Sequence, residues 1–417
     1  MSLSEKKEGI SLRQNMLWNS FGSMVNLACQ WLMTVLIVRI SNGYDAAGTL
    51  ALAMSVYNTF APVAVYRMYT YQVSDIRHEN TVGEYMSFRI VTSFMALALI
   101  IVYSLLTCSP DSLSVIFGYS LYKIAGLFID VLHGLDQVNR RMDYIGRSLI
   151  MQGIVSLVLF CTVELSFHVL EFTLVCMTVG TILVGLLYDL PRSSCFERVH
   201  LGISRSKAFH LLGYCFPIVI GAIACGAAPS IPRQFLAFHD GQAALGIYAS
   251  VAAPVTIIQM GASYIYNPLL SYFSQAYAEH DLRRLVMLLG KAFFGIVLLG
   301  IVSAIVLELV GEWVLSIMYG DDIVFYMYLL LPIIACSLVT AYVWFLNDIL
   351  VAFRDFKGSV VGNVVAVVLS AISSLVFVPA FAMNGVSFAH LLSYGISVIV
   401  MLLFLVRLFR RSKKATD

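Results

Sequence analysis

The amino-acid sequence predicts an all-α, polytopic membrane protein with about twelve transmembrane helices in two six-helix bundles. The first observation is composition, because 60% of the 417 residues are hydrophobic and only 12% are charged. A typical soluble protein has about 25% charged residues. The second observation is that the apolar residues come in runs of about twenty, the length that crosses a bilayer core as a helix. Irregular backbone is costly in lipid, so these runs are predicted to be helical.

Twelve candidate spans follow one another along the chain, and the charges of the loops between them alternate. Lys and Arg gather in the N-terminal segment, in the loops before the odd-numbered spans and in the C-terminal tail, and Arg67 and Arg89 are counted there. The opposite loops hold only Arg39 and Arg233, both at span ends. Because cytoplasmic loops retain basic residues, both termini are predicted to be cytoplasmic. The predicted spans are 16–38, 46–66, 88–107, 113–133, 148–167, 170–188, 211–232, 244–266, 290–309, 325–346, 359–379 and 385–406.

The two halves of the chain echo each other. In each half an apolar helix ends near an arginine, a polar turn follows and a helix with an early glycine begins, as in Arg39 to Gly48 and Arg233 to Gly246. A basic, Asp-aromatic-x-Gly turn also occurs twice, at 141–146 and 353–358. An even number of spans per half predicts a parallel repeat about an axis along the membrane normal. The predicted organisation is a six-helix half at 1–190, a cytoplasmic linker at 191–210, a second six-helix half at 211–407 and a basic tail at 408–417.

Polar side chains form stripes along some spans but not others. Residues three or four apart share a helix face, and polar groups facing lipid are expensive. The stripes therefore indicate either a hydrated central cavity or polar contacts between helices, and the charged members favour the cavity. The stripe of the first span is Asn19, Ser23, Asn26, Gln30 and Thr34, and that of the fourth is Tyr119, Lys123, Gly126, Asp130 and His133.

Cations near the cavity are the candidate binding groups. Lys123 is midway along its span, where a lone charge costs roughly 2.5–3.5 kcal/mol, so it is predicted to face water or an anionic ligand; the alternative is that it snorkels to an interface. Arginine offers a fork that suits phosphate, and Arg233, Arg39 and Arg67 are the candidates. Asp130 is the candidate carboxylate for ion coupling. Two further carboxylates, Glu164 and Glu308, lie near the predicted outer ends of spans and are expected to be exposed.

Signatures of soluble enzymes are missing from the sequence. It contains no GxxxxGK[ST], HExxH or GxSxG pattern. The eight cysteines are scattered, with no spacing typical of a metal site. Membrane enzymes that act on lipid-linked sugars keep their chemistry on a large loop, and none is predicted. We therefore expect no catalytic residues, no metal and no cofactor, and a protein that is not an enzyme.

The chain resembles the polysaccharide (O-antigen, Wzx-type) flippases of the multidrug/oligosaccharidyl-lipid/polysaccharide (MOP) exporter superfamily. The resemblance rests on the span number, the short loops, the Arg233…Gly246-x-Tyr248 junction and the exit Pro268-Leu269-Leu270-Ser271. It implies alternating-access export of an undecaprenyl-pyrophosphate-linked oligosaccharide across the bacterial cytoplasmic membrane, for surface polysaccharide such as lipopolysaccharide. Cavity cations hold the pyrophosphate in that family, and Arg233 matches by motif and Arg39 through the internal repeat. The sugars are then expected against Asn26, Gln30, Tyr119, Tyr122 and Tyr264.

Two other functions stay open at this point. A multidrug or cation antiporter of the same superfamily would have an acidic rather than a basic cavity. A membrane glycan polymerase or ligase would need a catalytic outer loop. The expected partners are the lipid-linked oligosaccharide, membrane lipid, a coupling proton or sodium ion and other polysaccharide-assembly proteins, and no nucleic acid is expected.

Overall fold

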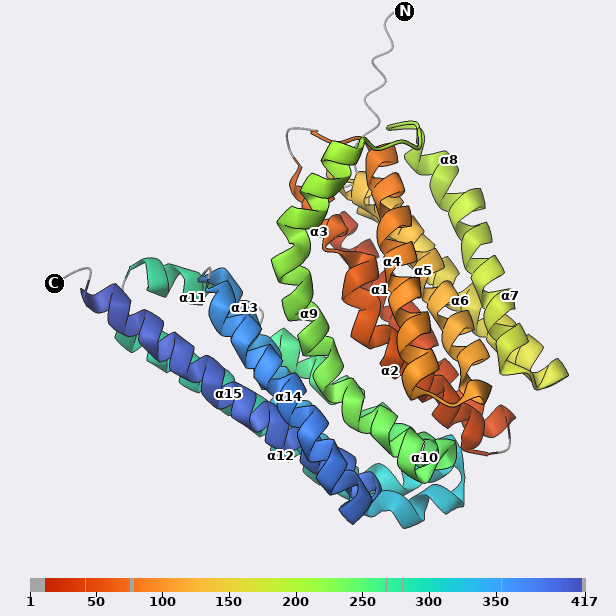
Figure 1. The fold of residues 1–417 in the computed structure, drawn as a ribbon, viewed down its shortest axis with the longest axis vertical. Coiled ribbons are helices and arrows are strands. Elements are labelled where there is room, and N and C mark those ends of the chain that lie inside the picture. The colour runs from red at the N-terminus through yellow and green to blue at the C-terminus, as the bar shows by residue number, and fades with distance from the viewer. Residues whose placement is uncertain are drawn as a thin grey trace, which may run out of the picture. The chain divides into compact units, whose positions relative to one another are not determined.

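A computed structural model describes residues 12–41, 43–75, 79–266, 269–279, 281–353 and 355–414, and all regular structure in them is helical (Figure 1). The helices of the N-terminal half are α1 (Leu12–Ile40), α2 (Asp45–Val65), α3 (Met68–Ser74), α4 (Val82–Thr107), α5 (Pro110–Val138), α6 (Met142–Phe167), α7 (Leu170–Val184), the π-helix η1 (Gly185–Asp189) and α8 (Leu190–Ser193). Those that follow are α9 (Arg205–Asp240), α10 (Gln242–Tyr266), α11 (Leu269–Ala278), α12 (Leu282–Tyr319), the 3₁₀ helix η2 (Asp321–Leu329), α13 (Leu330–Ala352), α14 (Phe356–Phe381) and α15 (Met383–Lys414).

Eleven of the described helical segments are long and apolar enough to cross a membrane, and the two parts of α9 make a twelfth if they count as one span. Each predicted span falls on one of these segments, so the all-α, roughly twelve-span fold class is confirmed. The observed helices extend beyond the predicted ranges. The largest consequence is at α4, which begins at Val82, so that Arg89 lies well inside the helix and not at its boundary with the loop. The prediction that Arg89 is a loop residue is wrong.

The chain divides into two compact units, of which the first comprises residues 1–41 and 60–219. Its tightest helix pair is α1 against α6, because glycines let the two backbones touch. A Cβ on Gly22 would lie 2.2 Å from the carbonyl oxygen of Gly146, and one on Gly153 would lie 2.9 Å from Cα of Asn26. Small residues of this kind allow close packing of membrane helices. The contact fixes the face of α1 that carries Asn26 and Gln30.

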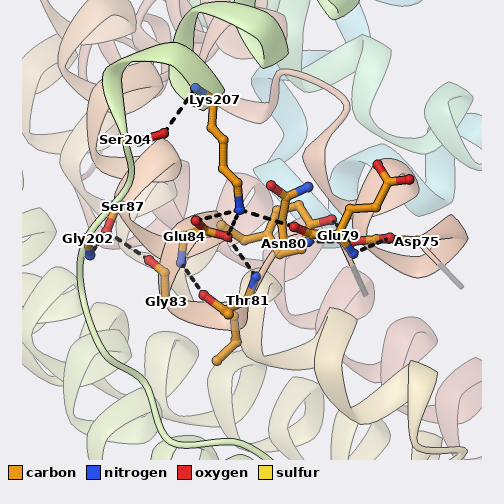
Figure 2. A network of polar contacts seen from close by, with 12 residues as sticks. Asp75, Glu79, Asn80, Thr81, Gly83, Glu84, Ser87, Gly202, Ser204 and Lys207 are labelled. Atoms are coloured by element: carbon orange, nitrogen blue, oxygen red, sulfur yellow. Dashed lines mark hydrogen bonds and ion pairs between the residues drawn. The ribbon is translucent and has the colours of Figure 1, made fainter. Parts of the chain in front are cut away.

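The segment that leads into α9 is fastened to the start of α4 (Figure 2). Thr81 and Glu84 form a capping box at the N-terminus of α4. The same Glu84 carboxylate accepts hydrogen bonds from Lys207 Nζ at 2.8 and 2.9 Å. The backbone N–H of Gly202 donates to Ser87 Oγ at 2.7 Å. Three short hydrogen bonds thus hold residues 202–207 against α4 within the first unit.

The second unit comprises residues 42–59 and 220–417, and it joins the start of α2 to α10. A Cβ on Gly48 would lie 1.8 Å from the carbonyl oxygen of Gln242, and one on Gly246 would lie 2.0 Å from that of Tyr44. These are the two glycines that the internal repeat aligns. The core of the unit lies between α10, α12, α13 and α15, around fully buried Phe345, Leu346 and Tyr394.

Candidate functional site

Lys123 on α5 has only neutral partners. Its Nζ donates to Gln30 Oε1 at 3.0 Å and lies 5.9 Å from the centroid of the Tyr122 ring. Gln30 Nε2 in turn donates to Asn26 Oδ1 at 3.3 Å. Among the residues that the structure describes, no carboxylate lies within 4.0 Å of the Lys123 ammonium group. The side chain is half-buried, so its positive charge is held in place without being neutralised.

Two tyrosines complete this group on α5. Tyr119 and Tyr122 are 8% and 7% exposed, and their ring centroids are 6.2 Å apart in an edge-on arrangement. Gly153 on α6 makes room for Asn26, so the positions of Asn26 and Gln30 follow from the α1–α6 contact. The structure therefore brings together Lys123, Gln30, Asn26 and Tyr122, four of the residues that the sequence singled out.

About two helical turns after Lys123 on α5, Asp130 forms an ion pair with Arg89 on α4. The ion pair between Asp130 Oδ2 and Arg89 Nη2 measures 3.5 Å, and the arginine side chain is 0% exposed against 32% for the aspartate. Arg89 Nη1 also donates to the carbonyl oxygens of Ala64 and Val65 at 2.6 and 2.7 Å. The last carbonyls of a helix lack helical donors, and α2 ends at Val65. Arg89 therefore caps α2 from a neighbouring helix.

The break after α2 explains why such a cap is needed. Tyr66 and Arg67 both have left-handed backbone, with φ of 46° and 58°, a conformation that costs energy in residues other than glycine. Sequence reasoning counted Arg89 with the loop charges because it placed the start of this span at residue 88, next to the arginine. The signal was present, since Thr81-Val-Gly-Glu84 is a capping-box pattern that places the helix start at residue 82.

In the second unit, Arg233 on α9 is the candidate cation. It is half-buried and lies close enough to act electrostatically on Tyr248, Cys336 and His390. Tyr248 is anchored by a 3.0 Å hydrogen bond between its hydroxyl and Ser387 Oγ. These neighbours come from α10, α13 and α15, so Arg233 stands within a buried polar group of the unit.

The hydrogen bonds of this group define the form of His390. Thr340 Oγ1 lies 2.7 Å from the Cys336 carbonyl oxygen, to which only the hydroxyl can donate. The same Oγ1 lies 2.8 Å from His390 Nε2. With its proton used on the carbonyl, the hydroxyl accepts from Nε2, which therefore carries a hydrogen. In this arrangement His390 Nε2 therefore cannot accept a proton for ion-coupled transport.

A second polar group of the same unit involves an amide that the sequence stripes did not include. Asn347 on α13 accepts from Ser359 Oγ at 2.6 Å and from Asn363 Nδ2 at 3.0 Å. It also donates to Asn363 Oδ1 at 3.3 Å. Ser359 and Asn363 are four residues apart and therefore share one face of α14, and Asn347 is their polar partner. The contacts join α13 to α14.

Other predicted residues are placed differently. Arg39 is exposed near the end of α1, and Arg67 is exposed at the break between α2 and α3. The side chain of Tyr264 lies outside the described residues. The expectation that Glu164 is exposed is wrong, because it is 2% exposed and accepts a hydrogen bond from Thr173 Oγ1 at 2.7 Å. Glu308 is exposed, as predicted.

No family model matches the chain. The capsular polysaccharide biosynthesis protein CapF of Staphylococcus aureus is 21% identical over 392 residues, which cover 93% of this chain and 97% of that protein. Among solved structures, the lipid II flippase MurJ in an inward closed conformation superposes with a TM-score of 0.73 at 12% identity, covering 96% of this chain and 89% of that one. An inward-facing multidrug resistance MATE family transporter of the MOP superfamily superposes with a TM-score of 0.69 at 13% identity, covering 95% of this chain and all of that one.

The chain has the fold of the MOP superfamily. The predicted helical fold class and the predicted likeness in fold to this superfamily are thereby confirmed, and the protein is a multi-pass membrane protein. Within this MOP fold, the structure supplies one cationic group in each compact unit, around Lys123 and around Arg233. The roles of these two residues, of Arg39 and Arg67, and of the tyrosines in binding stay predictions.

Proposed function

We propose that the protein is a flippase that moves an undecaprenyl-pyrophosphate-linked oligosaccharide across the bacterial cytoplasmic membrane for surface polysaccharide synthesis. The observation that carries the proposal is the Lys123 ammonium group, which is fixed by Gln30 and has no carboxylate partner among the described residues. A cation that is partly withdrawn from water and has no counter-ion is costly. An anionic head group would remove that cost.

The chemistry of the substrate fits these side chains. A pyrophosphate carries negative charge and accepts strong, charge-assisted hydrogen bonds from Lys and Arg. Its charges are expensive in hydrocarbon, so the head group needs a polar route while the prenyl chain stays in lipid. Tyr119 and Tyr122, beside Lys123, offer aromatic surface and hydroxyls to sugars, and Asn26 and Gln30 offer amides. Tyr264 stays a proposed member of this surface.

Arg233 is the proposed second cation. Because the two halves are predicted to be copies of one repeat, they would rock around the cationic site and expose it to each side of the membrane in turn. Arg39 and Arg67, being exposed, are proposed to meet the phosphate at the ends of its path. The proposal places both termini in the cytoplasm and includes no bond cleavage. The name of the Staphylococcus aureus relative supports the polysaccharide pathway.

The second candidate is a multidrug or cation antiporter, which the similarity to a multidrug resistance transporter favours. A cationic drug needs a carboxylate without a counter-ion. Asp130 is the carboxylate nearest along α5 to Lys123, and it is already paired with the fully buried Arg89. The arrangement of the two residues therefore favours an anionic ligand.

A binding measurement separates the two candidates. Purified protein in detergent is titrated with undecaprenyl pyrophosphate, with undecaprenyl monophosphate and with the lipophilic cation tetraphenylphosphonium. The proposal predicts preference for the pyrophosphate and loss of that preference in Lys123→Glu. The matched control is Lys291→Glu, at an exposed position on α12, which should bind as the wild type does. Preference for the cation would overturn the proposal.

A further inference from the structure

Asp136, near the C-terminal end of α5, is a buried carboxylate without a cationic partner among the described residues. It is 0% exposed. Ser193 Oγ donates to its Oδ1 at 3.0 Å, whereas its Oδ2 is buried and accepts no hydrogen bond from the described residues. Among these described residues, no Lys, Arg or His nitrogen lies within 4.0 Å of either carboxylate oxygen of Asp136. An ionised carboxylate in this position would keep an uncompensated charge.

Two further carboxylates lie nearby, and both are satisfied. Asp189 on η1 is 1% exposed and accepts from His133 Nε2 at 3.2 Å and from Ser148 Oγ at 2.9 Å. Asp143 is held by the guanidinium of Arg141 through two hydrogen bonds of 2.8 and 3.0 Å. Asp189, Asp143 and His133 are all close enough to Asp136 to act on it electrostatically. Asp189 and Asp143 disfavour a negative charge on Asp136. His133 does not compensate that charge, because its Nε2 is hydrogen-bonded to Asp189.

The remaining charged and titratable groups around this cluster have other partners. The Arg192 guanidinium stacks 3.8 Å from the Tyr188 ring and donates to the Tyr188 carbonyl oxygen. The Arg147 guanidinium lies 5.1 Å from the ring of Trp18. From α3, Tyr69 faces the cluster and donates its hydroxyl to Gln137. None of these groups pairs with Asp136.

A metal ion is a poor match for the charge on Asp136. Among the described residues, no group of three or more His, Cys, Asp or Glu side chains has an arrangement that could hold one. A buried carboxylate that has no cationic partner and lies near other acids is instead neutralised by taking up a proton. Asp130 contrasts with it, because Arg89 compensates its charge and a third of its side chain is exposed.

We propose that Asp136 Oδ2 is a proton-binding site and that its proton exchanges during the transport cycle. Water supplies the proton, which converts the carboxylate to a neutral acid, and release regenerates the anion. The proposal that Asp136 holds a proton in the resting protein is argued from the geometry of the cluster alone. The exchange during transport rests on the proposed flippase function. The coupling carboxylate is then Asp136 rather than Asp130.

Infrared spectroscopy tests the occupancy without substrate. The full-length protein in lipid nanodiscs should show a carboxylic-acid C=O band at neutral pH that Asp136→Asn lacks. The matched control is Glu164→Gln, which removes another buried carboxylate with a single hydroxyl donor and should retain the Asp136 band. Ser193→Ala keeps the carboxyl but removes its donor, so the band should remain and shift. Identical carboxylic-acid bands in the wild type and Asp136→Asn would overturn the proposal.

Transport in proteoliposomes tests the exchange. A pH gradient should raise the rate at which the wild type flips an undecaprenyl-pyrophosphate-linked saccharide. In Asp136→Asn the ratio of rates with and without the gradient should fall to one, while Glu164→Gln keeps the wild-type ratio. A wild-type ratio in Asp136→Asn would overturn the exchange. Absence of any flipping by the wild type would contradict the flippase function, and the infrared bands would still decide whether Asp136 binds a proton.

Discussion

Replacing Arg89 by methionine tests whether a buried arginine on α4 holds the end of α2. Methionine fills similar space but donates nothing, so it removes the contacts to the carbonyl oxygens of Ala64 and Val65 and to Asp130. The Ala64 carbonyl keeps a second donor, Thr92 Oγ1 at 3.0 Å. The Val65 carbonyl loses the guanidinium, its one side-chain donor among the described residues.

The expected cost follows from that difference. A buried polar group left without a partner costs about 1–3 kcal/mol, and the loss of a charged donor at Ala64 adds about another 1 kcal/mol. The ion pair contributes little, because Asp130 is 32% exposed and partly exposed pairs are worth about 0–1 kcal/mol. Arg89→Met should therefore lower the free energy of unfolding by about 2–4 kcal/mol, and Asp130→Asn by about 0–1 kcal/mol.

The assay is equilibrium unfolding in mixed detergent micelles with increasing denaturing detergent, followed by the loss of helical circular dichroism. Arg89→Lys is the matched variant, since it retains the charge but lacks a guanidinium fork that reaches two carbonyl oxygens; its cost should lie between those of Arg89→Met and Asp130→Asn. If Arg89→Met and Asp130→Asn were equally destabilised, the arginine would act only through the ion pair and the capping role would be refuted.

Two other predictions follow from glycine contacts and from the native thiols. Gly22→Ala should lower the free energy of unfolding by about 1–3 kcal/mol, because its Cβ would meet backbone of α6 at 2.2 Å and overpacking costs that much. Gly43→Ala, whose Cβ would meet nothing within 4 Å, should be neutral in the same assay. Cys195 is exposed in the segment before α9, so a membrane-impermeant maleimide should label it only after cells are opened if that segment is cytoplasmic. Cys108 should be labelled in intact cells, but slowly at neutral pH and faster as the pH rises. The reason is that burial raises the pKa of its thiol, and the thiolate is the reactive form. Labelling of Cys195 in intact cells would contradict the predicted topology.

The helices could be predicted from the sequence because membrane spans are set by hydrophobic length, a local property. All twelve ranges fall on helical segments, although helix ends shifted by up to ten residues, as at Tyr319, where the predicted span ended at residue 309. The polar stripe on α1 was also visible in the sequence, and the structure shows that two of its members, Gln30 and Asn26, meet near Lys123. In each case the informative residues are neighbours on one helix face.

Contacts between helices could not be predicted in the same way. Arg89 resembles an ordinary cytoplasmic basic residue until its helix start is known, and its carbonyl partners on α2 carry no sequence signal. Glu164 is buried because Thr173 on the following helix faces it. Asp136 differs from Asp130 only in its surroundings, which come from α6, η1 and α8. Burial and pairing depend on the packing of segments that periodicity within one helix does not describe.

Transbilayer movement of a lipid-linked saccharide tests the central claim most directly. The protein is reconstituted in liposomes with a fluorescent undecaprenyl-pyrophosphate-linked saccharide, and the fraction accessible to an impermeant quencher is followed over time. The wild type should equilibrate the lipid between leaflets, and Lys123→Gln should slow it by about 10–100-fold, the loss of one charge-assisted contact of about 1.5–3 kcal/mol. Equal rates in protein-free and wild-type liposomes, or in the wild type and Lys123→Gln, would contradict the claim.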